Sequence, residues 1–363
     1  GLFAADVARV TGREIPVVDG SELPAKTRCA VIVGTVGQSR WIDELAAAKK
    51  IDVTPIEGGW ERYTLRLVDR PGHGLRKALV IAGSDRRGAA YGLLSVSRAI
   101  GVNPWYWGLY RWAKENFEKE LGNIGPKTYE KVCELLLRLQ ANYLAPAMHD
   151  ATTAFYKIPE NRVIADRYGI AIGSSHCEPL GLNTASEWDS KTMGEWDYVN
   201  NRAGVDRVLK ERVETSAPYE NVYTLALRGL HDRAMAGSED LNARKATMQE
   251  ALLAQRQTLA DVLGKPAEEI PQVFTPYKEV LDVYNRGLQL PDDVTIIWPD
   301  DNYGYMKRLS SPEEQKRSGR SGVYYHSSYL GRPHDYLWMN TTSPTLMYEE
   351  LRKAYDSTAD RVW

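Results

Sequence analysis

The sequence predicts a mixed α/β protein with two parts, a small α/β domain over residues 1–104 and a TIM, or (β/α)8-type, barrel over residues 105–363. Three observations lead to this fold class. The chain has 363 residues, which is long for one average domain. Short apolar runs alternate with helical patterns along most of it. In the second part, the apolar runs end in polar clusters, as barrel strands do beside an active site.

The first part contains two compact β-branched runs and a helical pattern. CAVIVGTV (29–36) and KALVIAGS (77–84) are expected to be strands, and AAYGLLSVSRAIG (89–101) has helical spacing with a glycine at its end. The glycines of GTVGQS do not complete a dinucleotide fingerprint. We therefore predict no nucleotide site and no cofactor in this domain.

The second part consists of repeated units of a helix and a short strand. The aromatic stretch NPWYWGLYRW (103–112) marks the boundary before them. Helices are expected over 128–140 and 240–263, and strands within 142–150, 167–179, 221–232, 294–298 and 321–329. Strands separated by helices pair in parallel through right-handed crossovers. A doubly wound open sheet is the alternative, but it would place ligand residues mainly at one switch point.

Composition excludes several classes of partner. The net charge of −2 gives no electrostatic case for binding nucleic acid or an anionic membrane, and no apolar stretch is long enough to span a bilayer. Three cysteines form neither a disulfide framework nor a zinc set. The 10 Trp and 21 Tyr against 4 Phe suit stacking on sugars, although aromatic core filling explains many of them equally well.

Polar side chains follow the predicted strands at their carboxyl ends. They are His176, Glu178, Arg228, His231, Asp232, Asp300, Asp301, Asn302 and His326, with Glu279 close by in the sequence. Their spacing contains no tight metal-ligand motif, so no metal is predicted. Two of the carboxylates would suffice for a glycosidase, which needs one protonated and one ionised carboxyl group. A binding protein with the same residues is the alternative.

Arg228 suggests an acidic sugar, because a guanidinium matches a carboxylate with two parallel hydrogen bonds. The other interpretation of Arg228 is an ion pair with Asp232, four residues on.

Several long motifs resemble glycoside hydrolase family 115, the xylan α-1,2-glucuronidases. They are PWYW (104–107), NIGPKTYEKVCELLLRLQANYLAPAMH (123–149), GSSHCEP (173–179), LRGLHDRAM (227–235), YKEVLDVYNRG (277–287), WPDDNYG (298–304), RLSSPEEQKRSGRSGVYYHSSYLGRP (308–333) and ADRVW (359–363). The resemblance implies an inverting hydrolase that releases α-1,2-linked glucuronic acid, or its 4-O-methyl form, from glucuronoxylan or its oligosaccharides. It also implies a small α/β domain, a TIM barrel and further C-terminal helical domains.

The resemblance also implies roles for individual residues. Glu279 is expected to be the general acid, with a pKa raised by partial burial, and Asp232 the base, although these two roles could be reversed. Arg228 would clamp the uronic carboxylate. The remaining substrate contacts would come from His176, Asn302, His326, Tyr329 and Trp298, the last two being equally suited to packing. Glu178, Asp300 and Asp301 are expected to support these residues rather than touch the sugar.

The sequence departs from the family pattern in two places. Family members carry a stretch of the type R-G-I-F-x-N-D-E after the PWYW segment, whereas here Trp107 runs directly into Gly108. The chain also stops at Trp363 as another strand begins, so the barrel is expected to be incomplete. An inactive fragment or a non-catalytic module that binds uronic acid or xylan is therefore the alternative. A homodimer is a further option for completing the site.

Xylan breakdown implies a secreted or periplasmic location. The opening residues GLFAADVARVTG resemble a helix entered partway, and no signal peptide is visible in them.

Overall fold

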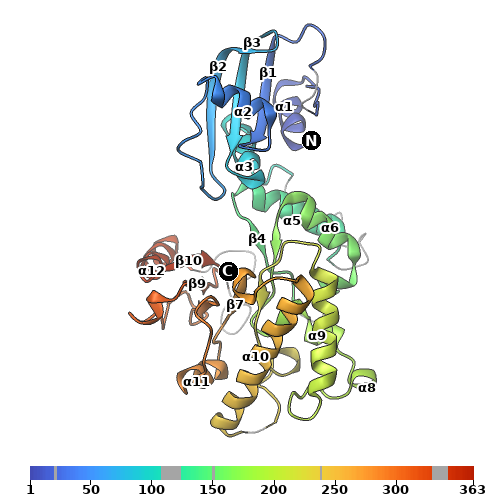
Figure 1. Cartoon of the computed structure of the whole chain (residues 1–363), viewed down its shortest axis with the longest axis vertical. Coiled ribbons are helices and arrows are strands. Elements are labelled where there is room, and N and C mark those ends of the chain that lie inside the picture. The colour runs from blue at the N-terminus through green and yellow to red at the C-terminus, as the bar shows by residue number, and fades with distance from the viewer. Residues whose placement is uncertain (20–22, 108–123, 149–151, 238, 329–341) are drawn as a thin grey trace. The chain divides into compact units, whose positions relative to one another are not determined.

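The computed structural model describes residues 1–19, 23–107, 124–148, 152–237, 239–328 and 342–363. The chain divides into two compact units (Figure 1). The first comprises residues 1–143 and 163–170, and the second comprises residues 144–162 and 171–363. Among the described residues, no helix combines the length and the apolar character needed to cross a bilayer.

The first unit is built on a three-stranded sheet. Its helices are α1 (Leu2–Thr11), α2 (Arg40–Ala47), α3 (Arg86–Ala99) and α5 (Pro126–Arg138), and its strands are β1 (Cys29–Thr35), β2 (Tyr63–Gly72) and β3 (Leu75–Gly83). The strand order is β1-β3-β2, with β1 parallel and β2 antiparallel to β3. Both predicted strands and the predicted helix over 89–101 are present. The antiparallel strand β2 was not predicted.

Alternation along the strands explains which face of this sheet is buried. On β3, Ala78, Val80 and Ala82 point into one apolar cluster, and the neighbouring strands contribute Ile32 and Val68 to the same cluster. Helix α2 covers this face with its two buried apolar side chains, Ile42 and Leu45. The three strands and α2 are the blue and cyan elements of Figure 1.

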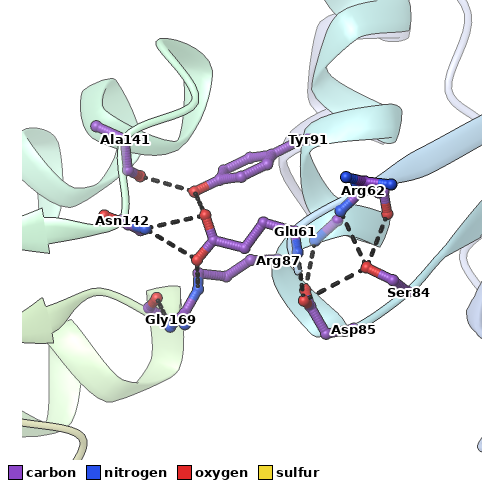
Figure 2. A network of polar contacts seen from close by, with 10 residues as sticks. Glu61, Arg62, Ser84, Asp85, Arg87, Tyr91, Ala141, Asn142 and Gly169 are labelled. Carbon is purple, nitrogen blue, oxygen red and sulfur yellow. Dashed lines mark hydrogen bonds and ion pairs between the residues drawn. The ribbon is translucent and has the colours of Figure 1, made fainter. Parts of the chain in front are cut away.

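Glu61 lies at the centre of a polar network in the first unit (Figure 2). Its carboxylate accepts hydrogen bonds from Arg87 Nε at 2.5 Å and from Asn142 Nδ2 at 2.9 and 3.0 Å. The Tyr91 hydroxyl donates to the same carboxylate at 3.5 Å, and burial raises the pKa of Tyr91, which keeps it protonated. The Glu61 amide donates to Asp85, the residue that also caps α3. The network thus joins the start of β2 to α3 and to the segment that follows α5.

Replacing Glu61 by alanine is expected to lower the free energy of unfolding by about 3 kcal/mol, because it leaves the nearly buried Arg87 side chain without its carboxylate. Urea unfolding of the Glu61→Ala variant measures this. Glu44→Ala, which removes an exposed ion pair with Arg40, is the control and should leave the unfolding midpoint close to that of the parent. Equal midpoints for the two variants would contradict a structural role for the network.

The second unit contains a parallel sheet and the longest helices. Its strands are β5 (Ala171–Ile172), β6 (Tyr223–Thr224), β7 (Gln272–Phe274), β8 (Thr295–Pro299), β9 (Ser321–Tyr324) and β10 (Ala359–Val362). Its α-helices are α7 (Thr184–Glu187), α8 (Ser190–Met193), α9 (Arg202–Ser216), α10 (Leu241–Leu263), α11 (Glu279–Asn285) and α12 (Pro344–Asp356). Single 3₁₀ turns are η1 (Phe155–Lys157), η2 (Pro179–Gly181), η3 (Leu230–Asp232), η4 (Ala267–Glu269) and η5 (Glu314–Lys316). β4 (Tyr143–Leu144) and α6 (Pro159–Tyr168) each contain a boundary between the two units.

The strands of this sheet lie side by side in chain order. β6 to β10 form one parallel sheet, and a parallel bridge between Ile172 and Asn221 places β5 beside β6. Parallel pairing through helices was predicted and is confirmed. The order of the described strands shows no reversal point, which distinguishes it from a doubly wound sheet. Because parallel neighbours end at the same edge, the residues that follow these strands are brought together.

Strand β7 was not predicted, and its burial explains why. All three of its residues are buried, as are the first four residues of β8. A strand buried on both faces carries no alternation of polar and apolar residues, and three residues are too few for a periodic signal. Helices α9 and α10 lie side by side (Figure 1), and their buried apolar side chains form the main apolar core with Phe274.

Candidate active site

Five loops that follow the parallel strands supply the polar groups of the site. His176 follows β5, Arg228 and Asp232 follow β6, and Glu279 follows β7 at the first position of α11. Asp300 to Asn302 follow β8, and His326 follows β9. The structure therefore places the sequence-predicted residues that it describes on consecutive loops at the carboxyl ends of parallel strands, where ligands bind in α/β proteins. Strands β6 to β9 belong to one sheet, and a single bridge joins β5 to it.

Arg228 connects the two carboxylates that were predicted to be catalytic. Its Nε and Nη2 donate to the two oxygens of Glu279 at 3.0 and 2.9 Å, and its Nη1 is ion-paired with Asp232. Arg228 is 2% exposed. Of the two roles considered for Arg228, the geometry favours the ion pair over a clamp on a sugar carboxylate, because the guanidinium already holds two carboxylates in a buried position.

The two carboxylate oxygens of Asp232 contact three side chains. His176 Nε2 lies 2.7 Å from Oδ1, which also contacts Arg228, and Lys278 Nζ lies 3.3 Å from Oδ2. The backbone of His231, Asp232 and Lys278 is left-handed, with φ of 55°, 63° and 51°. Such φ values are uncommon outside glycine and cluster at functional sites. Asp232 is thus bonded to two cationic side chains and one imidazole.

His176 is a buried, neutral member of this group. Its Nδ1 lies 3.0 Å from Ser175 Oγ. Burial lowers the pKa of His176 to about 3, and the neighbouring charges of Arg228 and Lys278 act in the same direction. A neutral imidazole has one donor and one acceptor nitrogen. Because Asp232 can only accept while it is ionised, Nε2 carries the proton and donates to it.

A cavity of about 300 Å³ opens beside Asp232. Its lining residues are Met148, Cys177, Glu178, Asn183, Thr184, Ala185, His231 and Asp232. The volume is at the lower end of small-molecule sites, which range over about 300–1,000 Å³. Glu178 was predicted to support the site, but here it faces the same cavity as Asp232. It is 6% exposed, and its Oε2 accepts a hydrogen bond from the Ser175 amide at 2.9 Å.

A second polar group lies after β8 and β9. Asp300 accepts hydrogen bonds from the His326 amide at 3.0 Å and from the Asn302 amide at 3.1 Å, and His326 Nδ1 lies 2.6 Å from it. Asn302 has a left-handed φ of 71°, and its buried Oδ1 has no hydrogen-bond partner among the residues that the structure describes. A buried carbonyl oxygen without a donor is costly, so this atom is suited to a ligand hydroxyl.

Aromatic rings connect the two polar groups. The ring of His176 lies 4.3 Å from that of Tyr277 and 5.9 Å from that of Tyr324, and Tyr324 lies 4.7 Å from His326. Sequence reasoning missed both tyrosines as site residues. Their positions in the sequence could have indicated this role, because Tyr277 precedes Glu279 by two residues and Tyr324 precedes His326 by two.

Two predicted residues have other surroundings, and a third lies outside the described residues. Asp301 accepts hydrogen bonds from the amides of Tyr303 and Tyr305; burial acts to raise its pKa, but these bonds and Lys307 lower it overall. Trp298 is 0% exposed and donates from Nε1 to Ser310 Oγ at 2.9 Å. Trp298 is therefore a core residue, and its predicted contact with substrate is corrected. Tyr329 lies outside the described residues.

One group has the residue types of a metal site. Ligand atoms of His176, Cys177 and Asp232 lie within 4.8 Å of one another. Arg228 and Lys278 already neutralise Asp232, and burial raises the pKa of the Cys177 thiol to about 12. A thiol that stays protonated and a carboxylate that is already paired are poor ligands for a cation. The surroundings favour an ion-paired carboxylate over a metal centre.

Comparison with known proteins identifies the family. The model of glycosyl hydrolase family 115 matches residues 97–363. This chain belongs to glycoside hydrolase family 115. The family 115 chain is also similar to a solved structure described as a novel family GH115 4-O-methyl-alpha-glucuronidase, BtGH115A, with specificity for decorated arabinogalactans. The two share 38% identity with a TM-score of 0.89 over 100% of this chain and 51% of that chain. The resemblance predicted from the motifs is thus confirmed, and the family 115 chain spans about half the length of this relative.

Two other solved structures are much less similar to the family 115 chain. D-psicose 3-epimerase in the presence of D-fructose shares 12% identity and a TM-score of 0.32 over 67% of this chain and 80% of that chain. CpGH84D shares 10% identity and a TM-score of 0.35 over 89% of this chain and 54% of that chain. These values are too low to add to the assignment. The comparison with curated proteins found no match.

Proposed function

We propose that this family 115 chain carries the active site of an α-glucuronidase, which releases α-1,2-linked glucuronic acid or its 4-O-methyl form from a decorated polysaccharide. The observation that carries the proposal is the pairing of the Asp232 carboxyl group with two cations beside a sugar-sized cavity. Family membership supports it, and so does the description of BtGH115A as a 4-O-methyl-alpha-glucuronidase.

We also propose that the parallel strands belong to a TIM barrel. The described strands β5 to β10 follow one another in chain order, and each pair is parallel. In a (β/α)8 barrel, catalytic residues come from the ends of several different strands. The distribution of His176, Asp232, Glu279 and His326 over four loops supports this proposal.

In the proposed reaction, Asp232 is the general base. The enzyme inverts, so a water molecule attacks the anomeric carbon from the face opposite the leaving group and gives a proton to this carboxylate. Arg228 and Lys278 keep Asp232 ionised before the attack, and the Nε2–H of His176 orients it. Glu279 holds Arg228 in place through its paired hydrogen bonds.

Lys278 replaces Arg228 as the proposed contact for the uronic carboxylate. Its side chain is 51% exposed, whereas that of Arg228 is 2% exposed. An accessible ammonium attracts an anion without breaking a buried ion pair. Asn302 Oδ1 would accept a hydrogen bond from a sugar hydroxyl, and His326 would donate one from its Nε2.

The polysaccharide is proposed to be glucuronoxylan, and decorated arabinogalactan is the second candidate because BtGH115A is described as specific for it. Polymers of this size are degraded outside the cytoplasm, so we expect the protein to be secreted or periplasmic.

The experiment is to incubate the full-length protein with each polymer and measure the free uronic acids chromatographically. We expect release of (4-O-methyl-)glucuronic acid from glucuronoxylan. Release only from arabinogalactan would keep the activity and replace the substrate. Tight binding of glucuronic acid without release from either polymer would favour a non-catalytic binding protein.

A further inference from the structure

The predicted general acid, Glu279, is bonded through both of its oxygens to a buried guanidinium. Both oxygens of Glu279 accept hydrogen bonds from the Arg228 guanidinium, which cannot give up its own proton. An inverting glycosidase needs one carboxyl group that carries a proton to the leaving oxygen. Glu279 and Asp232 are both bonded to Arg228, whereas Glu178 is a further carboxyl group of the site and has no contact with that guanidinium among the interactions of the described residues.

We propose that Glu178 is the general acid of this site. It faces the cavity that Asp232 also lines, and it comes from the loop after β5, whereas Asp232 comes from the loop after β6. Two carboxyl groups on different loops around one cavity are the arrangement that hydrolysis with inversion uses. This inference rests on the proposed function.

The surroundings of Glu178 favour its protonated form. The pKa of Glu178 is raised to about 7, chiefly by burial. The Ser175 amide acts to lower it, the Glu187 carboxylate to raise it, and Arg212, which is ion-paired with Glu187, to lower it. The other titratable groups that line the cavity are His231, Asp232 and the Cys177 thiol, which burial keeps protonated.

Asp232, in contrast, is paired with two cations. The two carboxyl groups that line the cavity thus have different surroundings, and such a difference separates the acid from the base in a pair of catalytic carboxyl groups.

The chemical step balances with these two groups. Glu178 gives its proton to the glycosidic oxygen as the bond from that oxygen to the anomeric carbon breaks, and the bonding electron pair stays with the oxygen. Water forms the new bond to the anomeric carbon and gives a proton to Asp232. Glu178 is then ionised and Asp232 protonated, and exchange with solvent restores both. One water molecule is consumed, and no other reactant is needed.

The test compares Glu178→Gln with Glu279→Gln in the full-length protein on two substrates. One is the polymer, and the other is an aryl α-glucuronide whose leaving phenolate needs no proton. We expect Glu178→Gln to lower kcat/KM about 10²–10⁴-fold on the polymer, and less than about tenfold on the aryl substrate. We expect Glu279→Gln to lower both similarly, because it disturbs Arg228. Equal losses of the Glu178 variant on both substrates would overturn the proposal.

The pH profile of the unaltered protein tests the same idea without a variant. As the pH rises through about 7, Glu178 loses the proton that it must donate, so activity on the polymer is expected to fall. The aryl substrate should not show this decline. A decline that is identical for both substrates would overturn the role of Glu178 while leaving the glucuronidase activity established. Absence of activity on both substrates would overturn the proposed function and this inference together.

Discussion

Replacing Asp232 by asparagine is expected to reduce release of glucuronic acid by about 10⁴-fold, at the upper end of what one general base contributes. Asparagine cannot accept the proton of the attacking water. The substitution also removes the negative charge that pairs with Arg228 and Lys278. The same carboxylate accepts the hydrogen bond from His176 Nε2. Initial rates of uronic acid release from the preferred polymer would measure this loss.

The control for this variant is Asp292→Asn. Asp292 precedes β8, at the end of the strand opposite to the site, and its side chain is 80% exposed and paired with Arg317. The control should retain the activity of the parent, and circular dichroism should show both variants folded. A folded Asp232→Asn variant with more than about a tenth of the parent's activity would rule out Asp232 as the base.

Replacing Arg228 by methionine is expected to have the largest effect on stability. It would leave Glu279 and Asp232 facing each other without the cation between them, at a position where the guanidinium is 2% exposed. Breaking a buried ion pair by removing one partner costs about 3–5 kcal/mol of folding free energy. Activity on the polymer should be lost as well, because Asp232 would lose its orientation. Urea unfolding and polymer hydrolysis measure the two effects.

A matched control and a double variant make this result specific. Arg207→Met removes an exposed pair with Glu211 on α9 and should leave the unfolding midpoint close to that of the parent. Adding Glu279→Gln to Arg228→Met should recover part of the lost stability, since it removes one unpaired charge. A double variant no more stable than Arg228→Met would mean that the loss arises from packing rather than from the unpaired carboxylate.

The strands of the second unit show how far local sequence predicts this fold. The β-branched run before Asp300 forms β8, and β9 lies within the predicted segment 321–329. Strand β7 was not predicted, because it is short and is buried on both faces. Strand β2 was not predicted because Leu65 and Leu67 are apolar although they are exposed, so its residues do not alternate between polar and apolar. Pattern reasoning detects an element where its two faces differ, or where, as in β8, a run of strand-forming residues is long enough to be noticed.

The sequence by itself determined which side chains follow the strands and, through its motifs, the family to which the chain belongs. His176, Arg228, Asp232, Glu279 and His326 were all located without coordinates. Their order along the chain follows the order of the strands, and neighbouring parallel strands end at the same edge, so proximity could be predicted from topology.

Only the tertiary structure decided how these residues pair. Glu279 was expected to be the general acid, and the structure bonds it to Arg228, which also pairs with Asp232. Glu178 was expected to support the site, and the structure places it in the lining of the cavity. Trp298 was considered as lining and is buried core. The protonation of a carboxyl group depends on burial and on charges within a few ångströms. Those surroundings come from loops far apart in the sequence, so no local motif encodes them.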